Sequence, residues 1–141
     1  ALDLGENGRY ITALTFGNVH GAYKPGHVKL RPELLGTIQE EVAAHFGLDH
    51  RPFDLVMHGG SGVSDDDYRK AIDAGIRKIN YYTYGVKYAG EAVQQVIADF
   101  KSKNADANVY WHDMTMAAYE RLYQDFTSVI KVFANGADPV A

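Results

Sequence analysis

Residues 53–62 read FDLVMHGGSG, and their pattern is the clearest structural signal in the chain. Its first five residues form a short apolar run, which is typical of a buried strand. A histidine and a glycine-rich segment follow directly, so the imidazole is expected at the strand's carboxyl end with pliable backbone beyond it. Residues 17–21, GNVHG, follow the apolar run 11–16 in the same way. The repetition predicts two histidines, His20 and His58, at one edge of a sheet.

The rest of the chain places helices between such strands. The expected order is strand, helix, strand, helix, strand, helix, helix, which predicts an α/β fold with a parallel sheet. The expected strands are 11–16, 53–57 and 76–82, with a short extended piece at 28–30; the expected helices run from 31–33 to 46, from a cap at Ser64 to Gly75, from about 88 to 103 and from about 115 to 134. The glycine-rich turns follow strands and precede helices, which is the edge where α/β proteins bind ligands.

Composition limits the function. The 141 residues suffice for one domain with a core, and 46% are hydrophobic. The net charge of −4 and pI near 5.8 argue against a nucleic-acid partner or an anionic membrane surface. The absence of cysteine excludes disulfides and thiolate metal sites. No apolar stretch reaches a membrane span and no signal peptide is visible, so a cytoplasmic protein is expected. The chain begins at Ala1 without an initiator methionine and reads as though it starts in mid-protein.

The two strand-end histidines are candidate metal ligands. Imidazole is a common ligand for zinc and also suits cobalt and iron. A catalytic zinc site needs about three protein ligands, so His20 and His58 form an incomplete site. Taken singly, each histidine is better explained by a hydrogen bond to nearby backbone; the matching settings of the two together favour ligation. The remaining histidines have no such setting and are assigned structural roles: His27, His45, His50 and His112.

The segment after His58 is a candidate phosphate cradle. Small residues at 59–62 let backbone N–H groups approach an anion, and a helix N-terminus follows near Ser64. Ser61 offers a hydroxyl and Lys24 a cation, although an ordinary tight turn and a solvated lysine explain the same residues.

The third strand also ends in polar residues. Asn80 is expected to orient a substrate oxygen or to cap a turn. Tyr81, Tyr82 and Tyr84 are expected to pack. Lys78 suggests a rival chemistry, because a buried lysine can form a Schiff base; a structural cation inside a barrel is the alternative.

Together, residues 17–26, 58–62 and 78–80 resemble the C-terminal part of the class II, metal-dependent fructose-bisphosphate aldolases, and the similarity spans about 11–84. The resemblance implies a (β/α)₈ TIM barrel of which this chain supplies about the last three βα units. Because a whole barrel needs about 250 residues, residues 1–141 are expected to be a single incomplete domain. The missing N-terminal part of the barrel is then a required partner.

The resemblance also assigns residues. His20 and His58 match zinc ligands, with Co²⁺ or Fe²⁺ as substitutes, and Asn80 matches a catalytic residue near the reacting carbons. The phosphate-binding positions are Gly21, Lys24, Gly59, Gly60, Ser61 and Thr83. The family also tends to hold K⁺ or Na⁺ through backbone oxygens at Gly21, Gly59 and Ser61. The remaining ligand, acid and base belong to earlier segments.

The implied function is reversible cleavage of fructose 1,6-bisphosphate, in glycolysis and gluconeogenesis, by a homodimer or higher homo-oligomer. After Asn80 the chain departs from the family pattern, and Tyr82 stands where an acid would read the far end of the sugar. Tagatose 1,6-bisphosphate, another ketose bisphosphate or a non-catalytic sugar-phosphate binding protein therefore remain alternatives. Arg121 matches an arginine that binds the distal phosphate across a dimer.

Overall fold

A computed structural model describes residues 10–20 and 28–137. They fall into two compact units, one ending at Tyr81 and the other beginning at Tyr82, and each is described by itself.

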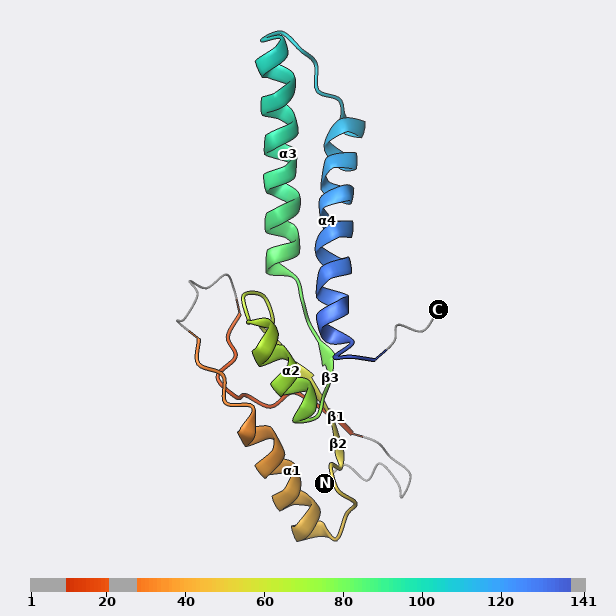
Figure 1. The fold of residues 1–141 in the computed structure, drawn as a ribbon. Helices are drawn as coiled ribbons and strands as arrows, with labels where there is room; N and C mark the ends of the chain where they lie inside the picture. The colour runs from red at the N-terminus through yellow and green to blue at the C-terminus, as the bar shows by residue number, and fades with distance from the viewer. Residues whose placement is uncertain (1–9, 21–27, 138–141) are drawn as a thin grey trace. The chain divides into compact units, whose positions relative to one another are not determined.

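The first unit is built on a parallel sheet (Figure 1). Its strands β1 (Tyr10–Thr12), β2 (Phe53–Met57) and β3 (Ile76–Ile79) lie in the order β1-β2-β3. Both pairs are parallel, with Ile11 opposite Asp54 and Met57 opposite Ile79. The α/β class and the parallel sheet are therefore confirmed.

The outer strands are shorter than the sequence predicts. β2 has the predicted bounds, but β1 ends at Thr12 instead of Phe16, and β3 ends at Ile79 instead of Tyr82. Beyond Thr12 the Phe16 N–H bonds to the Asn18 side chain instead of a neighbouring strand. β2 itself ends at Met57, which limits the ladder available to β3. Residues 28–30 form no strand.

Helices α1 (Glu33–Phe46) and α2 (Asp65–Asp73) connect these strands, close to their predicted bounds. Pro32 precedes α1, and Gly47 ends it with a left-handed φ of 65°. The buried positions of α1 recur every four residues at Leu35, Gln39 and Ala43, as expected for one helix face against a core. The fully buried side chains of this unit include Phe16, Leu35, Leu55, Met57 and Ile76.

The second unit is a helical hairpin of α3 (Thr83–Lys103) and α4 (Trp111–Phe133), which lie against each other. Both helices begin earlier than predicted. Gly85, in the first turn of α3, is buried, and a Cβ there would lie 3.5–3.6 Å from Leu122 and Phe126. The glycine therefore marks a close helix contact and not a break. At the start of α4, the Asp113 carboxylate accepts a hydrogen bond from the Tyr110 N–H at 3.0 Å.

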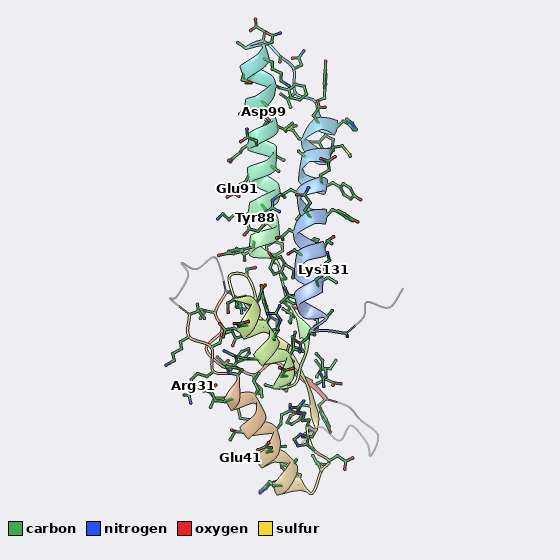
Figure 2. The ribbon with its side chains drawn as sticks, in the orientation of Figure 1. Arg31, Glu41, Tyr88, Glu91, Asp99 and Lys131 are labelled. Carbon is green, nitrogen blue, oxygen red and sulfur yellow. The ribbon has the colours of Figure 1, made fainter. Side chains whose placement is uncertain are left out.

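The outer surface of α3 carries charged side chains, among them Glu91 and Asp99 (Figure 2). Glu91 lies 3.7 Å from Lys87, one turn earlier. None of the described helices is both long and apolar enough to cross a bilayer.

Candidate metal and phosphate site at the strand ends

Two imidazoles lie side by side beyond the carboxyl ends of β1 and β2. The ring centres of His20 and His58 are 5.6 Å apart, with the ring planes tilted by 59°. Two imidazoles on one tetrahedral zinc, with Zn–N bonds of about 2.05 Å, have ring centres about 5.2 Å apart. The observed spacing therefore suits two ligands of a single metal ion. In the described part of the chain, no group of three or more His, Cys, Asp or Glu side chains is arranged to hold a metal.

Asn80 braces the second imidazole from the side. Its Nδ2 lies 3.0 Å from Nδ1 and 3.4 Å from Nε2 of His58. An atom so nearly equidistant from both ring nitrogens lies well off both lone-pair axes, because these axes diverge. The amide therefore contacts the ring side-on, which here means outside the lone-pair directions of both ring nitrogens. Those directions remain available to other partners. The Asn80 backbone is held by its N–H, which donates to the Met57 carbonyl at 2.9 Å.

The glycines after His58 allow close contacts that a side chain would prevent. Gly59 has a φ of +67°, and a Cβ there would overlap the Val19 carbonyl group. The loop carrying His20 thus lies directly on the loop that follows His58. At Gly60, a Cβ would lie 3.1 Å from Cγ2 of Ile79 and 3.2 Å from the Tyr68 hydroxyl.

The backbone of this loop is partly engaged. The Gly60 carbonyl accepts hydrogen bonds from the Tyr68 hydroxyl and the Val63 N–H. Ser61 is buried, with 3% of its surface exposed.

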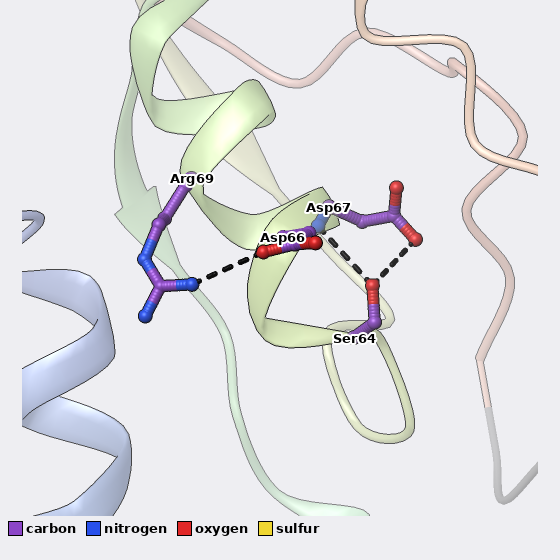
Figure 3. Close-up of polar contacts among 4 residues, drawn as sticks. All are labelled: Ser64, Asp66, Asp67 and Arg69. Carbon is purple, nitrogen blue, oxygen red and sulfur yellow. Dashed lines mark hydrogen bonds and ion pairs between the residues drawn. The ribbon is translucent and has the colours of Figure 1, made fainter.

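The start of α2 is occupied by its own cap. Ser64 Oγ accepts from the Asp67 N–H at 3.2 Å and donates to the Asp67 carboxylate at 2.8 Å, as Figure 3 shows. Asp65 and Asp66 share this first turn, and Asp66 pairs with Arg69. Three carboxylates at the helix start would repel a phosphate. The groups in this segment that are suited to an anion are therefore those of the glycine loop, ahead of the helix.

Asn18 is a site residue that the sequence reasoning missed. Its Oδ1 accepts from the Phe16 N–H at 3.0 Å, and its Nδ2 donates to the His58 carbonyl at 2.8 Å. An asparagine beside a glycine signals a turn in which the side chain binds nearby backbone. That signal predicts the bond to Phe16. It does not predict a partner 40 residues away.

The remaining residues that the sequence singled out lie elsewhere. Gly21, Lys24 and His27 lie outside the described residues. Thr83 is the first residue of α3, in the second unit. There, the Arg121 guanidinium lies over the Tyr88 ring, 4.4 Å from its centre.

The residues assigned structural or rival roles have ordinary surroundings. His45 contacts the ring of Phe46 edge-on, and His50 and His112 are exposed. Lys78 is exposed as well.

Comparisons with known proteins point to one family. The family model "Fructose-bisphosphate aldolase class-II" matches residues 4–135. A fructose-bisphosphate aldolase of Streptomyces galbus is 58% identical over 83 residues, which make up 59% of this chain and 24% of that protein. The corresponding enzyme of Mycobacterium tuberculosis is 52% identical over 85 residues, or 59% of this chain and 25% of that protein.

A solved structure of a protein with the same name is also similar to this chain. The crystal structure of a fructose-bisphosphate aldolase from Campylobacter jejuni matches with a TM-score of 0.69 and 27% identity, covering 87% of this chain and 39% of its own. The chain thus spans about a quarter of the length of the curated relatives it matches.

Proposed function

Because the chain belongs to the class II fructose-bisphosphate aldolase family, we propose that it carries part of the active site of a zinc-dependent aldolase. The reaction is the reversible cleavage of fructose 1,6-bisphosphate into dihydroxyacetone phosphate and glyceraldehyde 3-phosphate. The observation that carries the proposal is the pair of imidazoles 5.6 Å apart beyond the ends of adjacent parallel strands.

The proposal includes the architecture. The three parallel strands and their helices correspond to about the last three βα units of a TIM barrel, and residues 1–141 form one incomplete domain of it. The earlier barrel segments supply the remaining metal ligand and the acid and base. We also propose that the protein is cytoplasmic and that it forms a homodimer or a higher homo-oligomer.

His20 and His58 hold the metal ion in this proposal. When bound, zinc, or cobalt or iron in its place, supplies a Lewis acid that polarises the ketone oxygen of the substrate. His58 presents its ring at an angle that the side-on contact with Asn80 maintains. The Asn80 amide lies beside the reacting carbons and orients a substrate oxygen.

The loop after His58 holds the phosphate. The backbone N–H groups at Gly59 and Gly60 approach the anion without obstruction from a side chain, and Ser61 adds a hydroxyl. By the family resemblance, Gly21, Lys24 and Thr83 are further phosphate-binding residues, and backbone oxygens at Gly21, Gly59 and Ser61 hold K⁺ or Na⁺. The phosphate lies away from the reacting bond, so the free energy of binding it helps to hold the ketone in the reactive orientation.

The test uses the full-length protein, with metal content measured by mass spectrometry and cleavage of fructose 1,6-bisphosphate assayed on the same samples. We expect about one zinc per chain in the wild type. His58→Ala should lose both zinc and activity, while the matched variant His45→Ala, at the end of α1, should keep both. A chelator should abolish turnover, and added zinc or cobalt should restore it. Full activity after complete metal removal would contradict the proposal.

A second substrate is favoured by one observation. Tyr82 stands where the family pattern carries an acid. A phenol does not read a sugar hydroxyl as a carboxylate does, so tagatose 1,6-bisphosphate belongs in the same assay. Bound zinc with cleavage of tagatose 1,6-bisphosphate alone would change the substrate but keep the site. Sugar-phosphate binding without any turnover would identify a binding protein.

A further inference from the structure

The Asn18 side chain fastens one histidine loop to the backbone of the other histidine. Asn18 lies two residues before His20, and its Nδ2 donates to the His58 carbonyl at 2.8 Å. We propose that Asn18 is a positioning residue that sets the spacing of the His20 and His58 imidazoles. The inference rests on the proposed metal site and adds to it a residue outside the metal and phosphate positions named above.

A second contact beside this hydrogen bond supports the same role. The Val19 carbonyl lies against the α-carbon of Gly59, in the space that a Cβ would fill. The residue before His20 thus packs on the residue after His58, while Asn18 bonds to His58 itself. The hydrogen bond from Asn18 opposes separation of the loops, and the close contact at Gly59 limits how much nearer they can move.

The chemistry of an amide suits this position. The Phe16 N–H lies beyond the end of β1 and needs an acceptor, which Asn18 Oδ1 provides at 3.0 Å. The His58 carbonyl lies just beyond β2 and needs a donor, which Asn18 Nδ2 provides. One planar group carrying an acceptor and a donor serves both strand ends. An aspartate has nearly the same shape but cannot donate when ionised.

Asn18→Asp in the full-length protein is therefore the informative variant. It keeps the acceptor for Phe16 and places an oxygen against the His58 carbonyl, which should force the loops apart. Its control is Asn108→Asp, the same change at an exposed loop position. Zinc affinity is measured by competition with a chromophoric chelator. We expect Asn18→Asp to weaken binding by about 10- to 100-fold, the usual effect of losing a group that orients a metal ligand, and Asn108→Asp to leave it within about 2-fold of the wild-type value.

The sign of this result is diagnostic. An added carboxylate near a cation site would by its charge strengthen zinc binding, so weaker binding identifies lost positioning. Zinc binding by Asn18→Asp as tight as in the wild type would overturn the inference. Asn18→Ala, which removes both bonds and adds no charge, is the second variant should the aspartate variant fail to fold.

A metal-free readout separates this inference from the proposed function. With labelled histidines, a nuclear Overhauser cross-peak between the two rings is expected in the metal-free wild type and should be lost in Asn18→Asp. A cross-peak that persists in Asn18→Asp, or is missing from the wild type, overturns the positioning role. If the wild type binds no zinc, the metal site of the proposed function is wrong, and the cross-peak still decides the role of Asn18.

Discussion

At Gly59 a single hydrogen in place of a side chain lets two loops touch. The residue has a left-handed φ of +67°, and its α-carbon faces the Val19 carbonyl. Both features exclude an L side chain, one through backbone strain and the other through overlap. A residue without a functional group therefore allows the two histidine-bearing loops to lie in contact.

Gly59→Ala should lower the free energy of unfolding of the full-length protein by about 1–3 kcal/mol, which is the cost of a non-glycine residue in a disfavoured backbone conformation. Zinc affinity should fall as well, because the loops must separate. Chemical denaturation and zinc competition measure the two effects.

Gly36→Ala is the matched control. Gly36 lies within α1, and a Cβ there meets nothing within 4 Å. This substitution should stabilise the protein by about 0.5–1 kcal/mol, since alanine favours a helix over glycine. Equal stability for both variants would mean that the Gly59 contact does not form.

At the scale of the elements, α2 follows the glycine loop, and its cap determines where that loop ends. Ser64 satisfies the Asp67 N–H, so the helix begins at Asp65 without an outside partner. The acids of the first turn complement the helix dipole. The arrangement leaves the glycine loop, and not the helix, as the part able to meet an anion.

Removing this cap should destabilise the helix measurably. We expect Ser64→Ala to lower the free energy of unfolding by about 1 kcal/mol. Ser64→Thr should keep most of the stability that the cap provides, because threonine also carries a hydroxyl. Ser102→Ala, whose hydroxyl donates to a carbonyl near the exposed end of α3, is the control. A thermal melt in which both alanine variants match the wild type would exclude the capping role.

The start of α1 contains a pH-sensitive carboxylate. A hydrogen bond from its own backbone N–H and another from Arg31 hold the pKa of Glu33 below its ordinary value. A lowered folded-state pKa contributes stability that is complete above the unfolded-state pKa and is lost as the pH falls through the folded-state pKa. The carboxyl shift of Glu33, followed by NMR, should titrate below the ordinary glutamate range, and Arg31→Ala should raise its midpoint. Both side chains lie on the surface (Figure 2 labels Arg31), so the effect should shrink with added salt.

At the scale of the whole molecule, the described residues leave much apolar surface uncovered. In the described sheet, β1 and β3 each pair only with β2 and so present an open edge. One stripe of α4 is exposed at heptad spacing: Met116, Tyr119, Tyr123, Phe126 and Ile130. Among the described residues, the fully buried apolar side chains all belong to the first unit. Open strand edges and large apolar patches favour association.

Residues 1–141 expressed alone should therefore self-associate, whereas the full-length protein should form one defined oligomer. Size-exclusion chromatography with light scattering over a range of concentrations distinguishes the two. A double variant, Tyr119→Ser with Tyr123→Ser, should reduce association of the isolated chain; the matched change at Tyr10, 39% exposed on β1, should reduce it less. A monodisperse monomer of the isolated chain would contradict this expectation.

Local signals were enough to predict part of the fold. β2 was predicted at both ends, since an apolar run between polar segments has few alternatives. α1 and α2 were predicted closely, because Pro32, Gly47 and Ser64 mark their ends by short-range chemistry. The ends of β1 and β3 and the starts of α3 and α4 were not, because they depend on where a neighbouring strand stops and on how closely two helices approach. The family was identified from three short motifs, and the match over residues 4–135 confirms it.

Residue type and local pattern were enough to predict the strand-end histidines, the glycine loop and the polar end of the third strand. How these groups meet is seen only in the fold: the imidazole ring centres lie 5.6 Å apart, Asn80 contacts His58 across 22 residues, and Asn18 bonds to His58 across 40 residues. Such contacts join segments that are far apart in the chain and that come together only because the strands pair in parallel. No short-range pattern specifies them, because each partner satisfies its local rules without the other.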